Sequence, residues 1–221
     1  MKTVYTKAMA SIVTLLLPFI ILMAAVRLLI TPVFAKIEYQ LPGFPEDKFG
    51  FSLQERLQWS APSIKYLVNS EDITYLSELR FEDGTSIYND RELSHMVDVK
   101  ALVQIMIKVW LGCIALILLI VILLDNLKAR DILCKGFYWG GWLSIGFVLA
   151  MLLFVAINFN QLFTWFHYAF FEGDTWLFYE SDTLIRLFPL RFWQDAFIFV
   201  GSFTIVVGLL FVLVFRSKRL K

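Results

Sequence analysis

Four long apolar stretches constrain this chain more than any other feature of its sequence. Each is mainly apolar over the roughly 20 residues that a helix needs to cross the ~30 Å hydrocarbon core of a membrane. Hydrophobic residues make up 59% of the chain and charged residues only 18%, so a water-soluble fold would lack the polar side chains to cover its surface. The sequence therefore predicts an all-α membrane protein with four transmembrane helices. The stretches cover residues 9–30, 101–124, 137–159 and 193–215.

Basic residues beside these stretches predict the orientation of the chain, because loops rich in lysine and arginine stay in the cytoplasm. Acidic residues outnumber basic ones in the two remaining segments, 31–100 and 161–192. We therefore expect both termini in the cytoplasm and both of these segments on the outer face of the cell membrane. The basic residues are Lys2 and Lys7 before the first stretch, Lys128, Arg130 and Lys135 after the second, and Arg216, Lys218, Arg219 and Lys221 after the fourth.

This topology divides the chain into five parts. The two outer parts are too long and too apolar to be simple connectors. We expect the functional site on the outer face. The parts are a cytoplasmic tail with the first transmembrane helix (1–30), an extracytoplasmic cap (31–100), two transmembrane helices with a short cytoplasmic loop (101–160), an aromatic-rich extracytoplasmic loop (161–192), and the last transmembrane helix with its tail (193–221).

The cap carries local signals for both helix and hairpin. Residues 52–55 have the form of a capping box, which predicts a helix that ends near Pro62. Residues 79–88 contain two short apolar runs around an Asp-Gly turn, which predicts a small hairpin. Residues 89–92 form a second capping-box pattern, and that helix can run into the second span. These signals predict a small, mixed α/β cap.

Residues 161–192 are unusually rich in aromatic side chains. Such rings gather where a membrane meets water, so an interfacial belt is one interpretation. The other interpretation is that these rings form a wall around acyl chains, and the two interpretations are compatible.

The chain has only two histidines, and the predicted topology brings both to the outer membrane surface. His95 precedes the second span and His167 follows the third. Imidazole is the side chain best suited to move protons near neutral pH. In a helix, Glu92 and Asp98 share a face with His95, so Asp98 is a candidate to orient it. The alternative is that both histidines are interfacial polar residues without chemistry.

Other function classes leave few signals in the sequence. A formal net charge of +1 without a basic cluster argues against nucleic-acid binding. No hydrolase elbow, zincin motif or zinc-binding spacing occurs, and two histidines with a carboxylate are a weak basis for a metal site, so we expect no cofactor and no metal. Lys108 lies within a span and raises the possibility of transport, but the four spans lack inverted repeats.

Motifs in the two outer segments resemble those of a known family. The sequences of residues 92–100, 167–171, 176–178 and 182–189 together resemble the lipoprotein intramolecular transacylases of Gram-positive bacteria. The resemblance implies movement of the sn-2 acyl chain of a diacylglyceryl lipoprotein onto the amino group of its own N-terminal cysteine. Membrane lipid and this lipoprotein are the implied partners.

The resemblance also implies roles for particular residues. His95 and His167 fall within matching motifs and would be the two catalytic residues, one as base and one as acid. Arg186 would hold the oxyanion or the polar head of the substrate. The full set of implied orienting or substrate-positioning residues is Asp98, Lys100, Phe170, Phe171, Trp176, Asp182 and Arg186.

Three alternatives stay open. A transporter would have Lys108 lining a path that is open to both sides of the membrane. A non-catalytic receptor or assembly factor would keep its function without the histidines. A membrane lipid hydrolase would release a fatty acid and would not transfer it.

Overall fold

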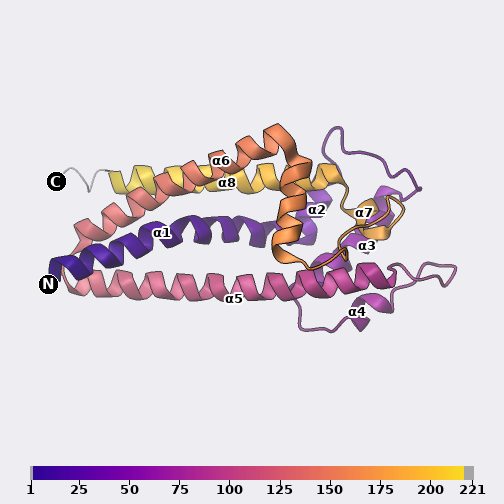
Figure 1. The fold of residues 1–221 in the computed structure, drawn as a ribbon, viewed down its shortest axis with the longest axis horizontal. Helices are drawn as coiled ribbons and strands as arrows, with labels where there is room; N and C mark the ends of the chain where they lie inside the picture. Colours follow the sequence, from indigo (N-terminus) through magenta and orange to yellow (C-terminus); the bar gives the residue numbers. More distant parts are fainter. Residues whose placement is uncertain (1, 217–221) are drawn as a thin grey trace. The chain divides into compact units, whose positions relative to one another are not determined.

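The structure is a computed structural model that describes residues 2–216. Lys218, Arg219 and Lys221, which entered the orientation argument above, lie outside the described residues. Within residues 2–216 the chain forms eight helices and no β-strand. In order these are α1 (Lys2–Leu29), α2 (Pro32–Glu38), α3 (Leu53–Tyr66), α4 (Thr74–Ser77), α5 (Asp90–Asn126), α6 (Arg130–Phe170), α7 (Thr183–Leu187) and α8 (Leu190–Arg216) (Figure 1).

Helices α1, α5, α6 and α8 are the membrane-spanning elements. Each is long and apolar enough to cross a bilayer. Helices α5, α6 and α8 each contain a predicted span, and α1 covers the first span except for its last residue, Ile30. The prediction of a multi-pass membrane protein is therefore confirmed. With 37 residues in α5 and 41 in α6, both helices are longer than a bilayer core requires, so part of each extends beyond it.

The described residues form two compact units. The first comprises residues 2–26, 106–156 and 198–216. Its helices approach closely at glycines: a Cβ added at Gly141 would lie 2.7 Å from the carbonyl oxygen of Gly208. Polar side chains also join the helices, since the Thr14 hydroxyl donates to the Gly136 carbonyl at 3.0 Å. Close contact at small residues is how helices pack in lipid, where burial from water contributes little.

The second unit comprises residues 27–105 and 157–197. In it, α3 contacts α2, α4 and α7. Ser52 caps α3 through the predicted capping box, in which its hydroxyl accepts from the Glu55 amide and the Glu55 side chain accepts from the Ser52 amide.

The predicted end of this helix near Pro62 is wrong, because α3 continues to Tyr66. The proline removes the N–H that would bond the Gln58 carbonyl, and side chains bond the carbonyl that follows it. The carbonyl of Trp59 accepts from the Tyr88 hydroxyl at 2.9 Å and from the Ser63 hydroxyl at 3.3 Å. A proline inside a helix is tolerated where such partners and tertiary packing offset the lost backbone bond.

The predicted hairpin is reduced to a turn. Arg80 and Ser86 form one isolated antiparallel bridge, and the Phe81 amide donates to the Thr85 carbonyl at 2.9 Å. No strand extends from this bridge within residues 2–216, so the mixed α/β description of the cap is wrong and the fold there is helical. Gly84, with φ of +86°, occupies the left-handed conformation that the turn requires.

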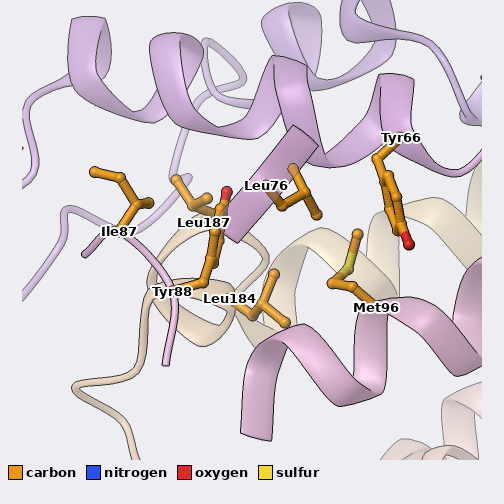
Figure 2. Packing of buried hydrophobic residues seen from close by; sticks show 7 residues of the cluster. All are labelled: Tyr66, Leu76, Ile87, Tyr88, Met96, Leu184 and Leu187. Atoms are coloured by element: carbon orange, nitrogen blue, oxygen red, sulfur yellow. The ribbon is translucent and has the colours of Figure 1, made fainter. Parts of the chain in front are cut away.

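A buried cluster holds the start of α5 against α7 and the turn (Figure 2). Leu76 and Leu187 are fully buried at its centre, and Met96 joins it from the residue after His95. The cluster therefore fixes the segment of α5 that carries His95. Its buried members are Tyr66, Leu76, Ile87, Tyr88, Met96, Leu184 and Leu187.

Helix α6 contains one break. Asn158 has non-helical dihedral angles (φ −157°, ψ 84°), one residue from the predicted end of the third span. Its side-chain oxygen accepts from the Gln161 amide at 3.1 Å, which caps a second helical segment. Residues 161–170, predicted as the start of an aromatic loop, are thus helical, and this segment carries His167.

Candidate active site

The two histidines face each other inside the second unit. His95 comes from the start of α5 and His167 from the end of α6. Their ring centroids lie 6.1 Å apart with an interplanar angle of 22°, and each residue is only 8% exposed. Two segments far apart in sequence therefore bring both imidazoles into one buried group.

A backbone carbonyl fixes the tautomer of His167. Its Nδ1 lies 2.7 Å from the carbonyl oxygen of Phe163, one helical turn earlier. Since a carbonyl oxygen only accepts, Nδ1 must carry a proton and donate it. In the neutral ring Nε2 is then unprotonated, so it can accept a proton from a substrate.

Aromatic rings enclose the pair. Phe171 contacts both imidazoles, with centroid distances of 5.0 Å to His95 and 5.6 Å to His167. The ring of Phe178 lies 5.3 Å from His95, and that of Trp176 lies 4.7 Å from His167. The pair therefore sits in surroundings that exclude most water.

Three polar atoms among these residues are buried without a hydrogen-bond partner among the described residues. They are Nδ1 of His95, Nε1 of Trp176 and Oγ1 of Thr175. Leaving a buried polar group unpaired costs about 1–3 kcal/mol. Such atoms are suited to bind polar groups of a substrate, and the indole N–H can act only as a donor.

Glu92 anchors the helix start that carries His95. This side chain is 1% exposed and accepts from the amides of Asn89 at 2.8 Å and Leu184 at 2.6 Å. The Asn89 side chain accepts in return from the Glu92 amide at 3.0 Å, which completes the predicted second capping box. Glu92 thus ties α5 to α7.

The carboxylate predicted to orient His95 forms no hydrogen bond with it. Asp98 is exposed, and no hydrogen bond joins it to His95. Within residues 2–216, no group of three histidine, cysteine or carboxylate side chains lies close enough to hold a metal ion. Contacts with aromatic rings and with the chain's own backbone orient the imidazoles in place of a carboxylate.

Three other predicted polar residues support the surrounding structure. Lys100 donates to Oδ1 of Asn69 at 2.9 Å, and Asp182 accepts from the side chain of Asn89 at 3.1 Å. Arg186 forms an ion pair with Asp47 at 2.9 Å. Burial alone would raise the pKa of Asp47, but the hydrogen bonds from Arg186 and the Phe51 amide hold that pKa below its usual value.

The predicted aromatic residues divide into two groups. Phe171 and Trp176 contact the imidazoles directly, whereas Phe170 is exposed and its ring packs on Phe166. The sequence reasoning missed Phe163, whose carbonyl sets the tautomer of His167. The four-residue spacing from Phe163 to His167 is the signal that would have found it, had residues 161–170 been predicted as helix.

A sequence model of one family matches most of this chain. The sequence model of the family described as "Lipoprotein intramolecular transacylase Lit" matches residues 11–193. An uncharacterized protein of Aquifex aeolicus (strain VF5) is 28% identical over 211 residues, which cover 92% of this chain and 91% of the relative.

Solved structures show the same fold. The in meso structure of the membrane integral lipoprotein intramolecular transacylase Lit from Bacillus cereus superposes with a TM-score of 0.80 at 23% identity, covering 97% of this chain and 95% of the other. A structure of that protein with one histidine changed to arginine gives 0.75 at 22% identity, covering 97% and 92%. Because the family model matches well over half of the sequence, this chain belongs to the lipoprotein intramolecular transacylases, a family of acyl-transferring membrane enzymes.

Proposed function

We propose that His95 and His167 catalyse transfer of the sn-2 acyl chain of a diacylglyceryl lipoprotein to the α-amino group of its own N-terminal cysteine. The product is a lyso-form lipoprotein with an N-acyl chain. The observation that carries this proposal is the burial of the chain's only two imidazoles 6.1 Å apart. Membership of the transacylase family supports the reaction class.

The reaction needs no acyl-enzyme intermediate, because donor and acceptor belong to one molecule. The amine nitrogen attacks the sn-2 ester carbonyl, the new C–N bond forms, and the C–O bond to glycerol breaks. Attack closes a ring of roughly eight atoms, which is slow in water because it restricts several bonds, so holding the ends together can supply much of the acceleration.

The two histidines have different roles in this proposal. His167, with its proton fixed on Nδ1, accepts the proton of the attacking amine at Nε2. Buried among aromatic rings, both imidazoles start neutral. The protonated His167 passes a proton to His95 as His95 gives its own N–H proton to the departing glycerol oxygen, so that one proton moves from nitrogen to oxygen and both rings end neutral.

The surrounding rings favour transfer over hydrolysis. Phe171, Trp176 and Phe178 pack against the imidazoles and limit the space for water beside the ester. Trp176 also has an unpaired indole N–H, which is suited to donate to the oxyanion that develops during attack. We infer that lipoprotein and lipid reach the site from the outer face, as the basic residues beside the spans predict.

Mass spectrometry of a diacylglyceryl lipopeptide incubated with the purified full-length protein tests the proposal. Wild type should shift one acyl chain from glycerol to the amine at unchanged total mass. His95→Ala and His167→Ala should each lower the rate by roughly 10²–10⁴-fold, because each removes one proton-transfer group. Gln161→Ala, an exposed change on the same helical segment as His167, is the matched control.

Two results would contradict the proposal. Equal rates in the folded histidine variants would move the chemistry elsewhere or favour a binding protein. Release of free fatty acid by wild type, with no N-acyl product, would indicate a hydrolase.

A further inference from the structure

Arg56 is a buried cation with unused hydrogen-bonding capacity. The residue is 6% exposed, and its Nη1 donates to the Pro45 carbonyl at 2.7 Å. Its Nε is buried and has no partner among the described residues. The guanidinium carbon lies 5.9 Å from the Tyr39 ring centroid and 5.4 Å from that of Phe44, so two rings hold the group in place.

This guanidinium lines an open pocket of about 410 Å³ in the second unit. The lining combines aromatic side chains with the first turn of α3, where Leu53 is exposed at the rim. Two acidic residues also line it: Glu46, which is exposed, and Asp47, which pairs with Arg186. Because Glu55 caps the start of α3, the buried positive group of this partly apolar lining is Arg56.

Asp47, whose charge acts on Arg56, forms its hydrogen bonds with other groups. Asp47 Oδ2 accepts from Nε and Nη2 of Arg186, at 3.1 and 2.9 Å, and from the Phe51 amide at 2.7 Å. No hydrogen bond joins Asp47 to Arg56. The Nε–H of Arg56 is thus a donor without a partner among the described residues. A guanidinium binds a two-oxygen anion through parallel N–H donors, so such an anion suits this group.

Helix α2, which leads into the pocket through Tyr39, bears an exposed apolar face. Val33 and Ile37, one turn apart, are 64% and 59% exposed, and Lys36 is exposed beside them. The helix starts three residues after the end of the first span, α1. Amphipathic helices that expose apolar and basic side chains lie on membrane surfaces. Lipid is therefore the expected neighbour of the exposed face of α2.

We propose that the pocket binds the phosphate of an anionic membrane phospholipid. Arg56 donates to the phosphate oxygens, while Phe44 and Phe51 contact the glycerol and the first carbons of the acyl chains. This lipid is distinct from the substrate. The pocket is lined by other residues than those around the histidine pair, and the acyl transfer proposed there involves no phosphate.

Native mass spectrometry of the full-length protein, titrated with dioleoylphosphatidylglycerol, tests this site. Leu53→Glu adds a carboxylate three residues before Arg56, on the same helix face, and an acid is favourable in the first turn of a helix. Its binding of the lipid should weaken about tenfold, because the added charge competes with the phosphate for Arg56. Leu53→Gln, of the same size without the charge, should stay within about twofold of wild type.

Further arms identify the ligand. Dioleoylglycerol, which lacks the phosphate, should not be retained, and inorganic phosphate should not displace the lipid at equal concentration. Arg56→Gln should lose the lipid like Leu53→Glu, provided that its thermal unfolding shows a folded protein.

Equal lipid retention by the glutamate and glutamine variants would overturn the proposal. Retention of dioleoylglycerol as strong as that of the phospholipid would also overturn it. Displacement by a water-soluble acidic peptide would assign the pocket to a peptide carboxylate and remove the lipid.

Discussion

The imidazoles of His95 and His167 derive their chemistry from what surrounds them. The Phe163 carbonyl keeps one proton on Nδ1 of His167, and Phe171 packs against both rings. Asp98, the expected orienting carboxylate, is exposed. A buried carboxylate beside each ring would favour a charged pair, whereas carbonyl and aromatic partners suit neutral imidazoles that pass protons on.

Trp176 provides a test of the donor assigned to the oxyanion. Trp176→Phe keeps a ring against His167 and removes the unpaired N–H. The rate of acyl transfer should fall by roughly 10–10³-fold with little change in KM, because the donor acts mainly in the transition state. Single-turnover transfer rates measure this, with exposed Tyr179→Phe as the control. A raised KM at unchanged kcat would show that the indole only binds substrate.

Glu38 makes the stability of the protein depend on pH. Burial, together with a hydrogen bond to Asp195 and its charge, raises the pKa of Glu38 to about 7. The folded protein thus holds this proton more tightly than the unfolded chain does. The contribution of Glu38 to the free energy of unfolding is fully present below pH 4.5. It falls by about 1–3 kcal/mol as the pH rises from there through about 7.

Thermal unfolding of detergent-solubilised protein between pH 5 and 8 measures this effect. Glu38→Gln should unfold at a higher temperature than wild type at pH 8, and the difference should shrink toward pH 5. Exposed Glu46→Gln is the control. If the unfolding temperatures of wild type and Glu38→Gln change with pH in parallel, Glu38 is not the source of the pH dependence.

Local sequence signals predicted where the helices begin better than where they end. The capping boxes at Ser52 and Asn89 are formed, because their partners lie within one turn and depend on little else. The continuation through Pro62 and the reduction of the hairpin depend on tertiary partners such as Tyr88, which no local pattern reveals. The helical segment 161–170 was missed because its aromatic richness has no clear periodicity.

Glycine contacts in the first unit make a prediction for helix packing. Gly141→Ala brings a Cβ against the Gly208 carbonyl and should destabilise the protein by about 1–3 kcal/mol. Gly146→Ala, in the same helix with nothing within 4 Å, should be neutral or stabilising, since alanine is the better helix former. Thermal unfolding midpoints compare the two, and equal shifts would show that these helices do not pack at Gly141.

At the scale of the whole molecule, composition and apolar stretches predicted the four spans, and motif resemblance predicted the family. The sequence predicted only that the two histidines lie at the same depth in the membrane. It did not predict that their rings face each other, because it does not specify how α5 and α6 are rotated about their axes. The five-part division and the orientation of the chain in the membrane stay predictions.

Cysteine labelling tests that orientation. In a variant without Cys113 and Cys134, a cysteine at exposed Glu82 should react with a membrane-impermeant maleimide in intact cells. A cysteine at exposed Asp131 should react only after permeabilisation, because positively charged loops stay in the cytoplasm. The reverse pattern would place the histidine-bearing segments on the cytoplasmic face.

The most direct test of the account is an isotope crossover. The purified protein receives an equal mixture of two diacylglyceryl lipopeptides, one with a deuterated sn-2 chain and one with a ¹³C-labelled peptide. Tandem mass spectrometry should find each sn-2 chain only on the amine of its original peptide, at unchanged mass, and no transfer by His167→Ala. Deuterated chains on ¹³C-labelled peptides, or an unlabelled sn-1 chain on the amine of the deuterated lipopeptide, would contradict intramolecular sn-2 transfer.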